Sequence, residues 1–318
     1  MLLAPESMHI PDGFLSLPVA AVMWAISALV IAVALRKNDP AIHEQNFPLV
    51  GVLAAAIFAA QMLNFAIAGG TSGHLLGAAL AAILVGPWTA VLIMTSVVGV
   101  QALIFQDGGL LALGANLFNM AVVGVFVSYA VYRPIYRLAG GRRWAPVAGG
   151  FAAGWLSVVA SALVVGFQLA LSGTTPANIV LPVMGGVHAL IGIGEGLATA
   201  GALVFLTAAR PDILTAGAGE QRLDRPVWLG GGILTLALLV LSPLASTHPD
   251  GLEWAAEQAG FLHLVREPLL TIIPDYLLPG ISNPAAATIL AGIVGTGMVT
   301  GMALVMARSR GRSRQQKG

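Results

Sequence analysis

The chain has 318 residues, of which 57% are hydrophobic and 9% are charged, and its mean hydropathy is +0.87. Soluble domains carry about 25% charged residues, so this composition predicts an all-α protein that crosses the membrane several times. The sequence contains no cysteine, which excludes disulfides, thiolate metal sites and thiol nucleophiles. The opening MLLAPES lacks a basic region and a long apolar run, so we do not expect it to act as a signal peptide.

Nine apolar stretches approach the length of a membrane span, which needs about 20 apolar residues. They cover residues 17–36, 48–68, 74–86, 88–105, 111–132, 145–171, 182–208, 227–245 and 285–307. The third and fourth form one continuous run, which we divide at Gly86-Pro87 because proline ends or kinks a helix. The third is short, so we expect it to be tilted or only partly inserted. The predicted fold is a core of about seven helices followed by a two-helix module.

The distribution of Lys and Arg predicts how these spans are oriented. If the N-terminus lies outside and the spans alternate, 14 of the 15 basic residues fall in inside segments and only Arg266 lies outside. The predicted outer face instead collects eight carboxylates together with His9, His74, His248 and His263. Such a face favours the capture of a cation, although outer loops that merely lack positive charge would look similar.

A polar segment flanked by prolines, residues 210–226, divides the chain into two parts. We expect a membrane domain at 8–209, a cytoplasmic linker at 210–226, a two-span module at 227–307 and a basic cytoplasmic tail at 308–318. No phosphate-binding loop of the form G-x-x-x-x-G-K-[ST] occurs, so this chain is not expected to bind ATP itself. The tail is expected to lie near anionic lipid rather than to bind nucleic acid.

The stretch MHIPDGFLS, which begins at Met8, has the chemistry of a chelating chain start. A free amine on Met8, the amide nitrogen of His9 and the His9 imidazole can bind one ion in fused rings, and His74 would supply a fourth nitrogen. Planar nitrogen sites favour Ni²⁺ or Cu²⁺. The alternative is that His9 and His74 are two ordinary histidines at the membrane interface.

Four further polar residues in or beside the apolar spans are candidates for supporting roles. His188 and Glu195 are seven residues apart and so share one helix face. Ionisable residues within spans are usually functional or paired, so these two could form an ion path or a coupling element, or could make a buried hydrogen bond between helices. Gln101 and Asp107 could orient a metal-ligating histidine by hydrogen bonding to it, or could merely cap the end of a span.

Four motifs, MHIPDGFLS, GTSGHLLG, FQDGG and HALIGIGEG, resemble the substrate-capturing subunits of cobalt and nickel energy-coupling-factor transporters, the CbiM/NikM family. The resemblance extends from Met8 to about Arg210. Around STHPDGLEWAAEQAGF the second part resembles the PDGLE module, which is related to the small CbiN/NikN subunit.

The resemblance implies that Met8, His9 and His74 hold a transported Ni²⁺ or Co²⁺, through the N-terminal amine, the backbone and side chain of His9, and the His74 imidazole. The residues before Met8 depart from the family pattern, because they would turn the Met8 amine into an amide. We therefore predict that translation begins at Met8, or that the preceding residues are removed.

The resemblance also implies a function without catalysis in a bacterial or archaeal cytoplasmic membrane. A separate transmembrane coupling subunit and two cytoplasmic ATPases would drive release of the ion inward, and no covalently bound cofactor is expected. In the first span, the pairs Ala21/Ala25 and Ala28/Ala32 have the small-xxx-small spacing that permits close helix packing. This face is a candidate contact for the coupling subunit.

Two other classes of function fit parts of the sequence. The first is a secondary metal carrier driven by an ion gradient, although the H-x-x-x-x-D-H spacing of known nickel and cobalt permeases of that kind does not occur. The second is an intramembrane serine protease, because GTSG at 70–73 fits the G-x-S-G pattern of rhomboids. That function would require Ser72 and His188 within hydrogen-bond reach.

Overall fold

The computed structural model describes residues 9–38, 47–140, 142–209 and 225–308. The helices are α1 (Leu17–Lys37), α3 (Phe47–Gln61), α4 (Ala78–Val85), α5 (Pro87–Val100), α6 (Leu113–Leu117), α7 (Gly124–Leu138), α8 (Ala145–Leu171), α9 (Ala177–Ala209), α11 (Arg225–Leu241), α12 (Gly251–Ala259) and α13 (Pro284–Arg308). Within the described ranges, the strands are β1 (Phe65–Ile67) and β2 (Thr71–Gly73), which pair antiparallel.

The all-helical, multi-pass prediction is confirmed. Within the described residues, six helices are long and apolar enough to cross a membrane, and two shorter apolar helices cover Phe47–Gln61 and Leu229–Leu244. A π-helical turn, Gln101–Phe105, extends α5, and another, Phe118–Val123, joins α6 to α7. Every predicted stretch contains a helix, and the third stretch holds only the eight residues of α4.

The division of the long apolar run at Gly86-Pro87 is also confirmed. Helix α4 ends at Val85, and α5 begins at Pro87. Between them Gly86 adopts φ 78°, a left-handed value that residues with a side chain rarely adopt, and proline is well suited to the first position of the following helix.

The second predicted stretch, 48–68, is wrong at its C-terminal end, because α3 stops at Gln61 and residues 65–73 form a β-hairpin. Tertiary hydrogen bonds favour the hairpin over a longer helix. The backbone N–H of Ser72 donates to the carbonyl of Pro249 (2.8 Å), and the Ser72 hydroxyl donates to the carbonyl of His248 (2.8 Å). The hairpin therefore lies against the segment that precedes α12.

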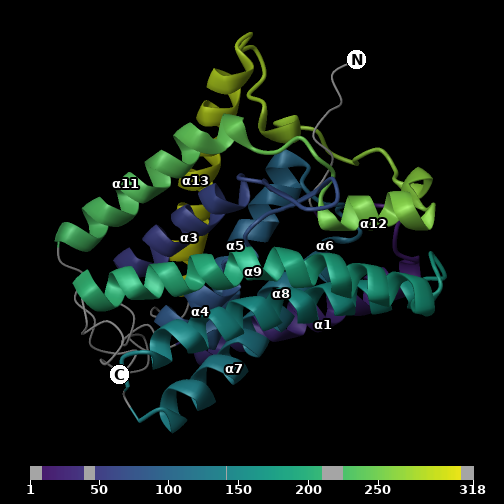
Figure 1. Cartoon of the computed structure of the whole chain (residues 1–318). Coiled ribbons are helices and arrows are strands. Elements are labelled where there is room, and N and C mark those ends of the chain that lie inside the picture. Colours follow the sequence, from purple (N-terminus) through teal and green to yellow (C-terminus); the bar gives the residue numbers. More distant parts are fainter. Residues whose placement is uncertain (1–8, 39–46, 141, 210–224, 309–318) are drawn as a thin grey trace, which may run out of the picture.

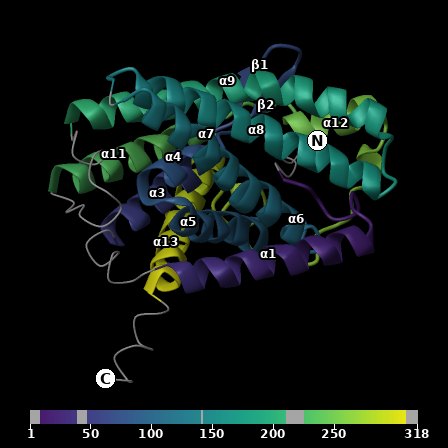
Figure 2. The same cartoon turned by 90° about the horizontal axis from the view of Figure 1, so that it is seen from below.

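The helices pack into a bundle in which α13 crosses the direction of α8 and α9 (Figure 1). Helices α8 and α9 lie side by side along their length (Figure 1). Helix α1 lies along one side of the bundle and contacts α5 and α6 (Figure 2). Helices α11 and α13 of the second part pack on α3, and α13 also packs on α5, so both parts share one hydrophobic core.

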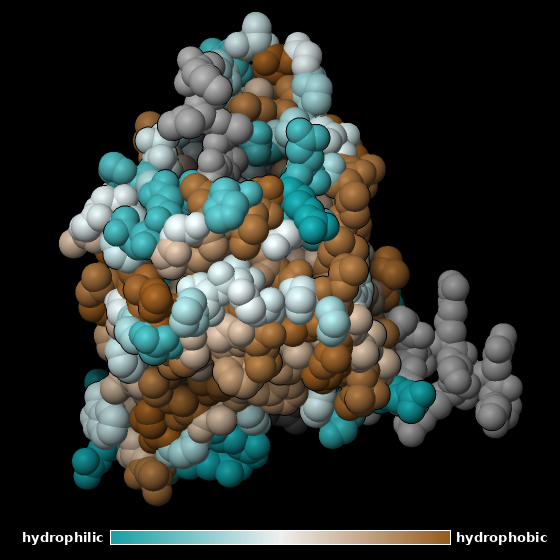
Figure 3. Space-filling model, turned by 90° about the vertical axis from the view of Figure 1, so that its right-hand side faces the viewer, coloured by the Kyte–Doolittle hydropathy of each residue, from teal (hydrophilic) through white to brown (hydrophobic). Residues whose placement is uncertain are grey.

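The two ends of the bundle carry different polar groups. At one end, the Asn38 side chain donates to the carbonyl of Ala307 (2.9 Å), and the Lys37 ammonium lies 4.4 Å from the centre of the Trp88 ring. This end, where α1 and α13 finish and α5 starts, corresponds to the predicted inside. The opposite end carries His9, α12 and the loop after α5, and hydrophilic residues lie among hydrophobic ones there (Figure 3).

Candidate metal site

Hydrogen bonds of the Ile10 backbone and of the Asp12 side chain hold the segment from His9 to Phe14 in the bundle. The Asn116 side chain accepts a hydrogen bond from the N–H of Ile10 (3.0 Å) and donates one to its carbonyl (3.1 Å). The Asp12 carboxylate accepts hydrogen bonds from three consecutive backbone N–H groups, those of residues 110–112, which lead into α6. A helix start exposes N–H groups without intrahelical partners and favours negative charge, so Asp12 stabilises both the helix and the segment.

This docking places His9 in a buried position, with 5% of its surface exposed. Its Nδ1 lies 2.9 Å from Asp107 Oδ1 and 3.1 Å from the Asp107 carbonyl. The chain comes so close here that a Cβ at Gly108, which also has φ +106°, would lie 3.0 Å from the His9 Cβ. Gly108 therefore permits His9 to lie against the loop that follows α5.

The His9–Asp107 pair is electrostatically coupled. Burial alone would lower the pKa of His9, but the Asp107 carboxylate outweighs burial and leaves this pKa above its usual value. Burial would raise the pKa of Asp107, but His9 and a hydrogen bond from the Tyr276 hydroxyl outweigh it and lower this pKa. The Asp107 carboxyl is thus held as an anion beside the imidazole.

His74 follows strand β2 and meets His9. The centroids of the two imidazole rings lie 5.4 Å apart, and the ring planes are inclined at 72°. Both rings line a cavity of about 90 Å³, together with His188 of α9 and Asp250. The structure therefore brings three of the histidines from the sequence analysis to one small cavity at the same end of the bundle.

Glu195 of α9 holds the backbone that follows His74. Its carboxylate accepts hydrogen bonds from the N–H groups of Leu76 (2.8 Å) and Gly77 (2.9 Å). The Gln61 side chain donates to the Leu76 carbonyl (2.7 Å), and Gln101 donates to Gln61 (2.8 Å). Both polar groups of the Leu76 backbone are thus satisfied by buried side chains, which fixes the course of the chain beside His74.

The second part of the chain closes one side of the cavity. Asp250 caps α12 by accepting a hydrogen bond from the N–H of Glu253 (2.7 Å), and it also lines the cavity with His9 and His74. Burial raises the pKa of Asp250 to about 7. The next residue, Gly251, lies so close to His188 that a Cβ there would come within 2.8 Å of the imidazole. Only glycine lets this turn approach α9.

The predicted site residues divide into three groups. His9, His74 and His188 line the cavity, and Asp107 contacts His9. Glu195 and Gln101 instead act on the backbone after His74, directly or through Gln61. Met8 lies outside the described residues. In the part of the chain that the structure describes, no group of three or more His, Asp or Glu side chains is placed to hold one ion.

Three residues that support this site are not candidates from the sequence alone: Gln61, Asn116 and Tyr276. Gln61 and Asn116 could have been noticed as amides within apolar stretches. Tyr276 lies outside the apolar spans and the motifs, so nothing in the sequence marked it.

The serine protease alternative is not supported. The Ser72 hydroxyl donates to the carbonyl of His248, and Nδ1 of His188 is 2.9 Å from the carbonyl of Met184 on the preceding turn of α9. Both side chains are therefore engaged with backbone carbonyls rather than with each other.

A multi-pass helical bundle with histidines gathered at a small cavity at one end defines a membrane protein of the metal-transporter class. The chain belongs to the CbiM family, since residues 9–213 match the family described as cobalt uptake substrate-specific transmembrane region. Residues 225–311 match the PDGLE domain. The family is one of nickel and cobalt transport proteins.

Relatives of known name cover most of the chain. A protein of Archaeoglobus fulgidus named "Putative fused nickel transport protein NikMN" is 40% identical over 95% of this chain and 98% of its own length. The fused nickel transport protein NikMN of Rhodobacter capsulatus is 35% identical over 79% of this chain and 76% of its own length. The cobalt transport protein CbiM of Geobacter sulfurreducens is 35% identical over 76% of this chain and 75% of its own length.

A solved structure is similar to a large part of the chain. It is a crystal structure of a truncated transition metal transporter, with a TM-score of 0.56 and 34% sequence identity. The match covers 64% of this chain and 99% of the solved one.

Proposed function

We propose that this protein captures Ni²⁺ or Co²⁺ at the outer face of the membrane and passes the ion inward. The proposed ligands are the amine of Met8, the backbone nitrogen and imidazole of His9, and the imidazole of His74. The observation that carries the proposal is the meeting of His9 and His74 at one buried cavity, with ring centroids 5.4 Å apart. Imidazole nitrogens are good ligands for both metals.

Binding of the ion through these ligands replaces the contact between His9 Nδ1 and Asp107 by a contact between His9 Nδ1 and the ion. A chelate ring that includes the His9 backbone nitrogen can close only through Nδ1, because Nε2 lies on the far side of the ring. In the structure, Nδ1 faces Asp107 at 2.9 Å. The His9 ring therefore turns from Asp107 to the ion when metal binds, and Asp107 remains behind it as a buried anion.

Energy for inward release is proposed to come from separate subunits. This chain carries no phosphate-binding loop, so a transmembrane coupling subunit and two cytoplasmic ATPases would supply ATP hydrolysis. The outer surface of α1 favours such an assembly, because Ala21, Ala25, Ala28 and Ala32 are all exposed on it. A carrier driven by an ion gradient would need none of these partners.

The test is metal binding to the purified full-length chain that begins at Met8, followed by uptake in cells. Isothermal titration with Ni²⁺ and Co²⁺ should show one site, which the substitution His74→Ala abolishes and the matched substitution His263→Ala leaves intact. Uptake should require the coupling and ATPase subunits and stop when ATP hydrolysis is blocked. Binding that is indifferent to His74→Ala would refute the site, and uptake by this chain alone would favour the secondary carrier.

A further inference from the structure

Tyr276, which belongs to the second part of the chain, reaches the candidate metal site from outside it. Its ring is buried and stacks on Phe105 at the end of the α5 span, with centroids 4.7 Å apart and planes inclined at 10°. Phe58 of α3 packs against the same ring at a centroid distance of 6.2 Å. The two phenylalanines fix where the Tyr276 hydroxyl points.

That hydroxyl donates a hydrogen bond of 2.6 Å to Oδ2 of Asp107. The other carboxylate oxygen, Oδ1, lies 2.9 Å from His9 Nδ1. One buried carboxylate thus links a residue of the second part to a proposed metal ligand of the first.

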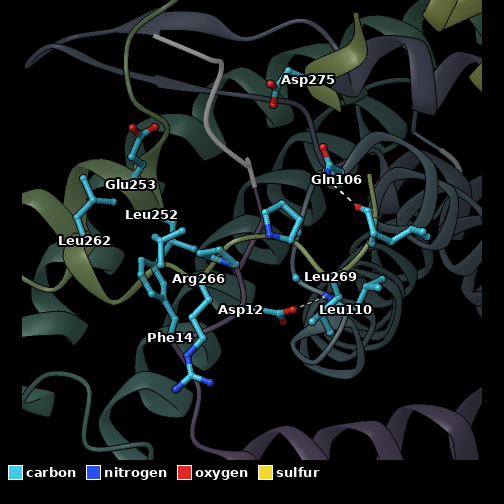
Figure 4. A pocket seen from close by; sticks show the side chains of 17 residues that line it. Asp12, Phe14, Gln106, Leu110, Leu252, Glu253, Leu262, Arg266, Leu269 and Asp275 are labelled. Carbon is cyan, nitrogen blue, oxygen red and sulfur yellow. Dashed lines mark hydrogen bonds between the residues drawn. The ribbon is translucent and has the colours of Figure 1, made fainter. Parts of the chain in front are cut away.

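The backbone around Tyr276 is held in an unusual conformation. Asp275 and Tyr276 have φ values of 53° and 56°, in the left-handed region that non-glycine residues rarely occupy. Such a conformation persists only where the surroundings enforce it. Here the N–H of Ile273 donates to the carbonyl of Ile104 (2.9 Å), and the Gln106 side chain donates to the carbonyl of Leu270 (2.8 Å; Figure 4). Hydrogen bonds therefore hold the segment around Tyr276 against the end of the α5 span and the loop that carries Asp107.

We propose that Tyr276 is a positioning residue for metal capture: it holds Asp107 in place while the His9 imidazole leaves this carboxylate for the ion. The proposal rests on the proposed function and gives the PDGLE domain a direct part in it. Burying a charged group without hydrogen-bond partners is costly. When His9 turns to the metal, the Tyr276 hydroxyl still donates to Asp107, so the carboxylate keeps a buried donor. Without that hydroxyl, Asp107 competes more strongly with the ion for His9.

The test compares Ni²⁺ affinity, by isothermal titration, in the full-length chain that begins at Met8 and in its Tyr276→Phe variant. This substitution removes the hydroxyl and keeps the ring that stacks on Phe105. We expect affinity to fall about tenfold, the lower end of what the loss of a supporting hydrogen bond around a metal site costs. Tyr136→Phe is the matched control, because Tyr136 stacks on Tyr132 within α7 and makes no contact with the site; its affinity should be unchanged.

A double-mutant cycle separates positioning from a general effect on structure. Asp107→Asn removes the charge that Tyr276 stabilises, so in this background Tyr276→Phe should change Ni²⁺ affinity by less than about twofold. An equal loss in both backgrounds, or no loss in the native background, overturns the proposal. If the native chain fails to bind Ni²⁺ and Co²⁺, or binds them without His74, the proposed function itself fails. Binding that needs His74 but not Tyr276 overturns this inference alone.

Discussion

His9 and His74 meet edge to face at a small cavity, with their ring centroids 5.4 Å apart. They reach this arrangement by different routes. His9 belongs to an N-terminal segment that Asn116 and the start of α6 hold in place. His74 follows the β-hairpin, and Glu195 holds the backbone after it. Different residues thus position the two histidines, so the contributions of Asn116 and Glu195 to metal binding can be tested separately.

The first prediction concerns where the functional chain begins. A chain that starts at Met8 presents a free amine next to His9, whereas a chain that starts at Met1 has an amide there. Because the amine is a proposed ligand, we expect Ni²⁺ affinity to be at least about 100-fold higher for the chain that starts at Met8. That is the upper end of what the loss of a mere outer partner of a ligand costs, about 10–100-fold. Isothermal titration of the two purified forms measures this. Equal affinities would show that the site depends on side chains without the amine.

The second prediction concerns Glu195. In Glu195→Gln, an NH₂ group replaces one of the two oxygens that accept hydrogen bonds from the N–H groups of Leu76 and Gly77. An NH₂ group is a donor, so one of these N–H groups loses its acceptor. The segment after His74 should loosen, and Ni²⁺ affinity should fall about tenfold. Glu257→Gln, on the exposed side of α12, is the matched control and should bind as the native chain does. An unchanged affinity for Glu195→Gln would mean that His74 does not need this support.

Much of this fold can be predicted because apolar periodicity and proline act locally. The break at Gly86-Pro87 follows from the geometry of proline and glycine alone, and the structure has it at that position. The end of α3 could not be predicted, because the hairpin after it forms hydrogen bonds with His248 and Pro249, far away in the sequence. An apolar pattern carries no information about such partners.

The same limit applies within the candidate site. A buried glutamate in an apolar helix indicates a partner, but only the fold shows that the partner of Glu195 is the backbone of Leu76 and Gly77. Asp107 was a candidate to support a histidine, and the structure places it against His9. Its second partner, Tyr276, lies in another part of the chain with no recognisable pattern around it, so three-dimensional contact alone reveals it.

The third prediction concerns the docking of the N-terminal segment. Asn116→Ala removes the side chain that pairs with both polar groups of the buried Ile10 backbone. The Ile10 carbonyl keeps a hydrogen bond from the N–H of Gly109 (2.9 Å), but the buried Ile10 N–H loses its acceptor. That loss costs about 1–3 kcal/mol, so we expect lower thermal stability together with weaker Ni²⁺ binding. Asn283→Ala removes an exposed hydrogen bond to the N–H of Ala286 at the start of α13 and serves as the control. It should affect stability without affecting metal affinity, as measured by thermal unfolding and titration.

The fourth prediction concerns the exposed alanines of α1. The buried residues of this helix are Ala20, Ser27 and Ala34, so Ala25 and Ala28 point away from the bundle. If the coupling subunit packs closely on this face, the double substitution Ala25→Leu/Ala28→Leu should separate the two backbones and reduce co-purification of that subunit several-fold. Ala198→Leu, at an exposed position of α9, is the control for added bulk in the membrane. Metal binding should be unaffected in both variants, because neither position lies near the cavity. Normal co-purification of the double variant would mean that the coupling subunit binds another face.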